Sequence, residues 1–224
     1  MQKAARPASE LPTLVAVSKT HPPEALREAI AHGVQLFGES RVQEAKAKIP
    51  LLPTSCRWHF IGHLQKNKIR QALPIFELFH GVDSLQTAKE MDRIAGELGL
   101  FPRILLEVNL AGEASKFGFP PKMLLSQFES LLHLPRLHIE GLMTIPPPAV
   151  EPELNRRFFS ALRNLRDTLA HDFGTPLPAL SMGMSDDYQV AVEEGATLIR
   201  IGSALFGTRH GTAWKPPTAD SLDE

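Results

Sequence analysis

Strand-like and helix-like patterns alternate eight times along this chain of 224 residues, and this alternation constrains the fold more than any other feature. The strand-like segments are short apolar runs: Leu14–Lys19, Val34–Gly38, Trp58–His63, Leu78–Ser84, Arg103–Leu110, Leu137–Ile145, Leu180–Ser185 and Thr197–Leu205. The segments between them favour helices: Pro23–His32, a polar stretch ending at Ile49, Leu64–Leu73, Leu85–Leu98, Pro121–His133, Glu153–His171 and Asp186–Glu194. Such alternation predicts an α/β fold of parallel strands joined by helical crossovers.

Eight such units favour a single, closed (β/α)8 TIM barrel, a fold that commonly has about 250 residues. An open, doubly wound sheet is the alternative. Because no linker or longer internal repeat interrupts the pattern, we expect residues 1–224 to form one domain, with an irregular tail from about residue 208. Ser84 is the expected N-cap of the helix Leu85–Leu98, which Gly99 ends.

The composition excludes several classes of protein. The 24 basic residues are offset by 25 acidic ones and are scattered, so nothing indicates a nucleic-acid partner. The single cysteine, Cys56, cannot form an intrachain disulfide, and the first residues lack a signal-peptide pattern. No apolar run approaches the roughly 20 residues that a membrane span needs. We therefore expect a cytoplasmic protein that does not cross a membrane.

Lys19, at the end of the first strand, is an unusual residue for a buried position. Val15, Val17 and Lys19 share one face of a strand, so valines that face the barrel interior would place the lysine amine there too. Burial would lower the pKa of that amine, and a neutral amine can attack an aldehyde. The alternative is a lysine whose head group reaches solvent at the end of the strand.

The loops after strands seven and eight of such barrels commonly bind phosphate. Both loops combine hydroxyl groups with glycine, which lets backbone N–H groups approach an anion: Ser181, Gly183 and Ser185 in the first, Gly202 and Ser203 in the second. We expect Ser185 to open a helix, whose N-terminus would also favour an anion. The alternative is that Ser185 only caps that helix and that Gly202 and Ser203 only form a turn.

Arg200 interrupts the otherwise apolar eighth strand, which lies beside the first strand in a closed barrel. Arg200 and Lys19 would then face the same cavity. An amine, a phosphate site and a fixed hydrogen-bond donor are the groups that pyridoxal 5′-phosphate (PLP) requires. The alternative is an arginine that pairs with a carboxylate.

Six blocks of the sequence, in this order, resemble the YggS/PROSC family of pyridoxal phosphate homeostasis proteins: Ala16–Thr20, Phe37–Glu44, Trp58–Lys68, Gly141–Ile145, Leu180–Asp187 and Arg200–Gly207. The resemblance covers residues 14–207 and implies a barrel of the alanine racemase N-terminal-domain type. It also implies an aldimine between PLP and Lys19, and an Arg200 that lies near the pyridine nitrogen. The phosphate-binding blocks contain Ser181, Gly183, Ser185, Gly202 and Ser203.

The same resemblance implies a protein that binds, buffers and delivers PLP, without catalytic residues or an established reaction. PLP-dependent apo-enzymes would be its transient partners, and we expect a monomer. Two features depart from the family pattern: Ser40 stands where asparagine is usual, and the segment before the first strand is shorter than usual.

Two other functions remain open: a PLP-dependent racemase or lyase, and an aldolase-type barrel in which Lys19 attacks a sugar phosphate. A racemase needs a second base, and the only tyrosine, Tyr188, is expected in the first turn of the helix after strand seven. We expect no metal site, because His59 and His63 on one strand would lie about 13 Å apart. Cys56 is interpreted as structural, and Lys66 and Lys68 as solvated.

Overall fold

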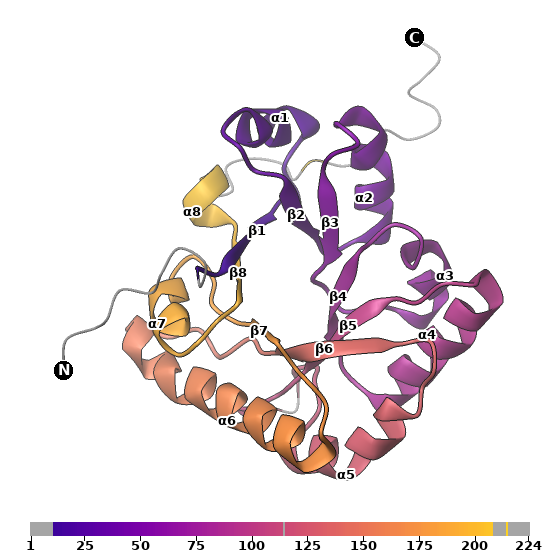
Figure 1. The fold of residues 1–224 in the computed structure, drawn as a ribbon. Helices are drawn as coiled ribbons and strands as arrows, with labels where there is room; N and C mark the ends of the chain where they lie inside the picture. The colour runs from indigo at the N-terminus through magenta and orange to yellow at the C-terminus, as the bar shows by residue number, and fades with distance from the viewer. Residues whose placement is uncertain (1–10, 114, 208–213, 215–224) are drawn as a thin grey trace.

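The computed structural model describes residues 11–113, 115–207 and 214. Eight parallel strands close into a barrel in chain order, and β8 pairs with β1 (Figure 1). The strands are β1 (Thr13–Val17), β2 (Leu36–Glu39), β3 (Arg57–Phe60), β4 (Leu78–Val82), β5 (Arg103–Glu107), β6 (His138–Met143), β7 (Ala179–Ser181) and β8 (Leu198–Ile201). The predicted (β/α)8 barrel is therefore confirmed, and the alternative of an open sheet is wrong.

Helices surround the barrel and cover its outer face (Figure 1). They are α1 (Pro23–Ala31), α2 (Val42–Lys48), η2 (Ile49–Leu51), η3 (Lys66–Lys68), α3 (Ile69–Ala72), α4 (Leu85–Leu98), α5 (Pro121–Leu132), η4 (Pro152–Asn155), α6 (Arg156–Phe173), α7 (Tyr188–Glu193) and α8 (Ser203–Phe206). Helix α4 has the predicted bounds. The Ser84 hydroxyl accepts a hydrogen bond from the Thr87 N–H at 3.2 Å, and Gly99 ends the helix with a φ of 69°. Both caps are therefore confirmed.

Successive side chains along each strand point alternately out of the barrel and into it. One set of side chains packs against the helices, and the other fills the barrel with an apolar layer: Val15, Leu36, Leu78, Leu105, Met143 and Leu198. Val15 is therefore on the inner face, as predicted. Four polar residues also occupy inward-facing strand positions: His59, His80, Ser181 and Arg200. Three of them are register partners of residues in the apolar layer, and His80 lies two residues from Leu78, which places it on the same face of β4. The barrel interior thus contains polar groups as well as apolar ones.

Three predicted boundaries near strands seven and eight are wrong. Strand β8 ends at Ile201 rather than Leu205, because Gly202 leaves the extended conformation and its carbonyl accepts hydrogen bonds from the N–H groups of Leu205 and Phe206, both at 2.9 Å. Likewise, β7 ends at Ser181, and α7 begins only at Tyr188. Ser185 therefore lies in a turn three residues before the helix that it was expected to open.

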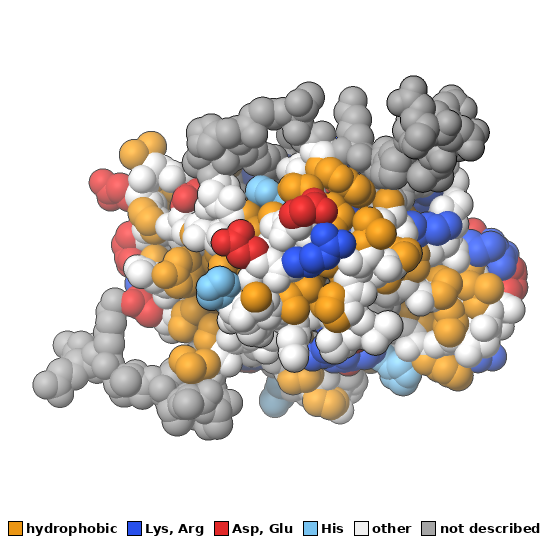
Figure 2. All heavy atoms as spheres, turned by 90° about the horizontal axis from the view of Figure 1, so that it is seen from above, with side chains coloured by type: hydrophobic (Ala, Val, Ile, Leu, Met, Phe, Trp, Pro, Cys, Tyr) orange, Lys and Arg blue, Asp and Glu red, His pale blue; other side chains and the backbone are white. Residues whose placement is uncertain are grey.

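The surface is consistent with the balanced charge of the sequence. Figure 2 shows one face of the molecule, on which basic, acidic and apolar side chains are interspersed. Within the described ranges, no helix is long and apolar enough to cross a membrane. The predicted irregular tail lies outside these ranges, apart from Trp214.

Candidate functional site

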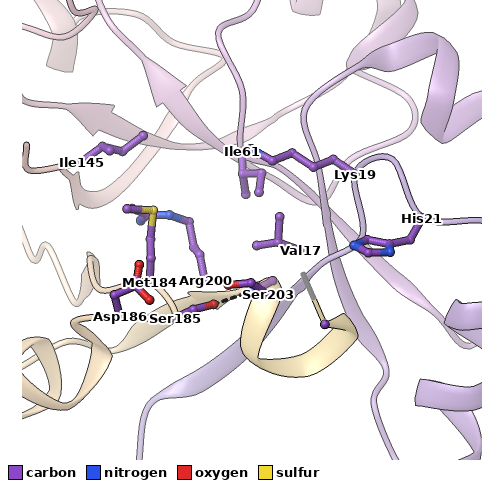
Figure 3. Close-up of a pocket in the computed structure, with 12 residues that line it drawn as sticks. Val17, Lys19, His21, Ile61, Ile145, Met184, Ser185, Asp186, Arg200 and Ser203 are labelled. Atoms are coloured by element: carbon purple, nitrogen blue, oxygen red, sulfur yellow. Dashed lines mark hydrogen bonds between the residues drawn. The ribbon is translucent and has the colours of Figure 1, made fainter. Parts of the chain in front are cut away.

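A cavity of about 230 Å³ opens at the carboxyl ends of the barrel strands. It is lined by Val17, Lys19, His21, Ile61, Ile145, Met184, Ser185, Asp186, Arg200, Gly202, Ser203 and Gly207, most of which are labelled in Figure 3. The structure thus brings together five of the seven predicted site residues: Lys19, Ser185, Arg200, Gly202 and Ser203. The other two, Ser181 and Gly183, lie outside this lining.

The sequence had predicted Lys19 as the last residue of the first strand. In the structure it lies two residues beyond the end of β1. It belongs to a turn in which the His21 N–H donates to the Ser18 carbonyl at 3.1 Å. The side chain is partly buried, and Figure 3 shows it reaching toward Ile61. Lys19 therefore lines the cavity, as predicted, but a turn and not the strand places it there. The lowered pKa of Lys19 stays a prediction.

Arg200 closes the inner end of the cavity, with only 3% of its surface exposed. One guanidinium nitrogen donates to the Ser181 hydroxyl at 2.5 Å, and the other donates to the Thr144 carbonyl at 2.9 Å. Burial lowers the pKa of Arg200 to about 10, so the group stays charged at neutral pH. In the described part of the chain, the hydrogen bonds of this guanidinium go to a hydroxyl and a carbonyl, not to a carboxylate.

Beneath Arg200, a chain of hydrogen bonds continues through the barrel. Because arginine can only donate, the Ser181 hydroxyl accepts from Arg200, and the same hydroxyl forms a hydrogen bond of 2.8 Å with Nδ1 of His80. Nε2 of His80 is hydrogen-bonded in turn to Nδ1 of His59 at 3.0 Å. Burial lowers the pKa of His80 well below 6.5 and that of His59 to about 3, so both rings are neutral. Ser181 therefore orients Arg200 from below.

The hydroxyls and amides predicted to bind phosphate meet at one side of the cavity. The Ser185 Oγ accepts from the backbone N–H groups of Gly202 at 3.3 Å and of Ala204 at 3.2 Å. Amides that converge on one oxygen are the donors that a phosphate group needs, and the adjacent Ser203 hydroxyl adds another. Gly183 permits close packing of α7, because its φ is 90° and a Cβ there would lie 2.5 Å from that of Ala191.

The donor set fits PLP on chemical grounds. The cavity has an amine at Lys19 for the aldehyde, a buried cation at Arg200 for the ring nitrogen, and the hydroxyls and amides of the two loops for the phosphate. Its apolar lining, which includes Val17 and Ile61, is suited to an aromatic ring.

The sequence reasoning missed several residues at or below the cavity. His21 lines it and stacks on Phe206, with ring centroids 4.9 Å apart, and Asp186 also lines it. His80 was missed although it lies two residues from Leu78 on the inner face of β4. A polar residue at an inward-facing strand position is the signal that could have found it.

The weaker candidates of the sequence lie elsewhere. His63 contacts Asp83 at 2.8 Å and stacks on Phe117, whereas His59 points into the barrel. No group of three histidine, cysteine or carboxylate side chains in the described ranges could hold a metal ion. Burial raises the pKa of Cys56, which makes its thiol a poorer nucleophile. Ser40 lines a separate cavity with Arg41.

The barrel and its cavity define a class of protein that the comparisons with known families also find. The family model described as alanine racemase, N-terminal domain, matches residues 1–210. Alanine racemase of Clostridium difficile has the same fold, with a TM-score of 0.72 at 16% sequence identity; the match covers 87% of this chain and 52% of the racemase. At that identity, the likeness shows the fold alone.

Closer relatives give the particular family. The pyridoxal phosphate homeostasis protein of Aquifex aeolicus is 45% identical over 197 residues, which cover 88% of this chain and 86% of that protein. The protein of the same name from Pseudomonas aeruginosa is 44% identical over 198 residues, 88% and 84% of the two chains. The chain belongs to the family of pyridoxal phosphate homeostasis proteins. The family predicted from the six sequence blocks is thereby confirmed.

A solved structure of this family carries the cofactor. PipY of Synechococcus elongatus, determined with PLP bound, has a TM-score of 0.83 against this chain at 42% sequence identity. The match covers 92% of this chain and 96% of PipY.

Proposed function

We propose that this protein binds PLP in the cavity at the carboxyl end of the barrel and acts as a carrier that buffers and delivers the cofactor. The observation that carries the proposal is the convergence of Lys19, Arg200 and the Ser185–Gly202–Ser203 group on one cavity of about 230 Å³. The PLP-bound PipY structure and the names of the relatives support it.

Lys19 would hold the cofactor as an aldimine. Its amine adds to the aldehyde carbon, a C=N bond forms, and the aldehyde oxygen leaves as water. Arg200 would lie at the ring nitrogen, with Ser181 fixing the guanidinium from behind. The phosphate would bind to Ser185, Gly202 and Ser203. Gly183 would contribute indirectly, by letting the loop that carries Ser185 pack against α7.

The carrier function is favoured over catalysis by the chemistry that Arg200 imposes. A charged arginine donates and cannot accept, so the ring nitrogen beside it must offer a lone pair. A neutral pyridine withdraws electrons less well than a pyridinium, so it stabilises a substrate carbanion poorly. As a carrier, the protein would act in the cytoplasm as a monomer and meet PLP-dependent apo-enzymes transiently.

A racemase or lyase of the same fold is the second candidate. The observation in its favour is that His21 and Asp186 line the cavity together with Lys19, so further titratable groups are within reach of a bound ligand. Measured turnover of amino acids by the PLP-loaded protein decides between the two candidates.

The experiment that tests PLP binding compares two ligands. PLP should give the wild-type protein a visible absorption band that borohydride bleaches, whereas pyridoxine 5′-phosphate, which lacks the aldehyde, should bind without a band. Lys19→Ala should lose the band but still bind pyridoxine 5′-phosphate, because the phosphate donors do not depend on the lysine. Lys89→Ala, which removes an exposed lysine of α4, is the matched control and should behave as wild type.

An unchanged band in Lys19→Ala would show that another lysine carries the cofactor. Failure of the wild-type protein to bind either ligand would reject the proposal. Borohydride trapping of a sugar phosphate on Lys19, without PLP binding, would instead indicate an aldolase-type barrel.

A further inference from the structure

The turn that presents Lys19 has a strained backbone. Thr20, the next residue, has a φ of 69° and is the one non-glycine residue with positive φ in the described ranges. It is the third residue of the turn closed by the hydrogen bond from the His21 N–H to the Ser18 carbonyl. Glycine is the usual residue where a turn requires positive φ, because a β-branched side chain crowds the backbone there. Other contacts must therefore hold the turn in this conformation.

Besides the hydrogen bond from the Trp214 N–H to the Thr20 carbonyl at 3.1 Å, these contacts come from a buried cluster of Ser18, Glu39, Glu44 and Lys48, called here the Lys48 network. The Thr20 N–H donates to Oε1 of Glu44 at 2.5 Å. The Lys48 ammonium donates to the same oxygen at 2.6 Å, to Oε1 of Glu39 at 2.9 Å and to the Ser18 carbonyl at 2.8 Å. An ammonium has three N–H donors, so all three are used. The network therefore binds the backbone on both sides of Lys19.

The burial of this network argues for a role beyond stability. Lys48 is 0% exposed and Glu44 is 4% exposed, so their charges are removed from water. A buried ion pair of this kind is often no more stabilising than apolar residues of the same volume, but it holds its partners in one geometry. The geometry that it holds here is the turn from Ser18 to Thr20.

The other side of the turn contacts the proposed phosphate-binding segment. The ring of His21 stacks on Phe206 of α8, the short helix that begins at Ser203. The backbone of Lys19 is thus fixed between the Lys48 network and the loop after β8. A change in the network would move the Lys19 amine without removing the donors at Ser185, Gly202 and Arg200.

We propose that Glu44 is a positioning residue for Lys19: its carboxylate, held by Lys48, captures the Thr20 N–H and keeps the strained turn that aims the Lys19 amine into the cavity. The inference rests on the proposed function, in which that amine reacts with PLP. Without the carboxylate, Thr20 relaxes toward negative φ, and the amine leaves its position beside the aldehyde. Ligand contacts that do not involve Lys19 remain.

The test uses two ligands and a double-mutant cycle. Glu44→Leu, which has a similar volume but offers no acceptor to the Thr20 N–H, should weaken PLP binding by roughly tenfold or more, since small misplacements of a reacting group have effects of this order. It should leave the affinity for pyridoxine 5′-phosphate, which cannot react with the amine, as in wild type. Thr20→Gly should bind both ligands as wild type does. The combination of Glu44→Leu with Thr20→Gly should recover most of the PLP affinity, because glycine adopts positive φ without strain.

Two further variants complete the design. Glu77→Leu makes the same chemical change at an exposed ion pair with Arg57 and should not alter either affinity. Glu44→Asp keeps the charge beside Lys48 but withdraws the carboxylate from Thr20 by one methylene group. It should therefore weaken PLP binding selectively, and it is measured in place of Glu44→Leu if that variant does not fold.

Three results would overturn the inference: an unchanged PLP affinity in the Glu44 variants, an equal loss of affinity for PLP and for pyridoxine 5′-phosphate, or no recovery of PLP affinity when Thr20→Gly is added. The proposed function fails separately. If the wild-type protein forms no borohydride-sensitive adduct with PLP, both the function and the inference are rejected, whereas a wild-type adduct with unaffected Glu44 variants rejects the inference alone.

Discussion

Replacement of His59 by glutamine should change how the stability of the protein depends on pH. Burial lowers the pKa of His59 from 6.5 to about 3. In the unfolded chain, the His59 ring therefore binds a proton below pH 6.5, whereas in the folded protein it binds one only below about pH 3. Because the unfolded state binds more protons in this window, stability falls as the pH falls through it. Between pH 7 and pH 5, His59 should lower the free energy of unfolding by about 2 kcal/mol.

Glu107 should act in the opposite direction. Burial, and then the charge of Asp83, raise the pKa of Glu107 from 4.5 to about 7. The folded protein therefore holds a proton that the unfolded chain releases above pH 4.5, and the resulting stability is lost as the pH rises through 7. Between pH 7 and pH 5, this group should raise the free energy of unfolding by about 2 kcal/mol, so the two effects nearly cancel in the wild-type protein.

Urea unfolding of the cofactor-free protein at pH 7 and pH 5 separates the two groups. On going from pH 7 to pH 5, His59→Gln should gain about 2 kcal/mol relative to wild type, and Glu107→Gln should lose about the same amount. The amide group of glutamine offers both a donor and an acceptor to Nε2 of His80, so the hydrogen bond between the two side chains can persist. Differences from wild type that are the same at both pH values would refute the reasoning that these two groups are buried with shifted pKa values.

Three more predictions follow from the described contacts. Nitrogen NMR of labelled PLP on the protein should show an unprotonated ring nitrogen, because Arg200 would donate to it in the proposed binding mode; a protonated ring would contradict that assignment. The PLP-loaded protein incubated with L-alanine in deuterated water should form no Cα-deuterated D-alanine at a catalytic rate, and formation that is lost in Lys19→Ala would identify a racemase. Ser84→Ala should lower the free energy of unfolding by about 1 kcal/mol, because it removes the hydroxyl that accepts from the Thr87 N–H; an unchanged urea midpoint would count against the cap.

The barrel was predictable because each strand is a short apolar run and because helical segments separate these runs at similar intervals along the chain. Helix α4 shows this best: Ser84 and Gly99 set both ends by local chemistry alone. The end of β8 was not predictable in the same way. The residues from Ser203 to Leu205 continue an apolar run, and only the backbone of Gly202 turns them into a short helix.

The side chains that support the site escaped prediction for a different reason. His59 and His80 are 21 residues apart and meet only because β3 and β4 pair in parallel. The segment that contains Glu44 and Lys48 looks like a solvated helix in the sequence, since its residues are mostly polar. Only the closed barrel places its charged face under the turn of Lys19, where three acceptors surround the ammonium.

The most direct test of PLP binding through Lys19 is a peptide map of the wild-type protein after incubation with PLP and reduction with borohydride. Reduction fixes the C=N bond as a stable secondary amine, so the modified lysine carries a pyridoxyl group that mass spectrometry locates. A pyridoxyl group on the peptide that contains Lys19, and stoichiometric with the bound cofactor, is the expected result. A pyridoxyl group on a different lysine, or none on any peptide, would contradict the proposed site.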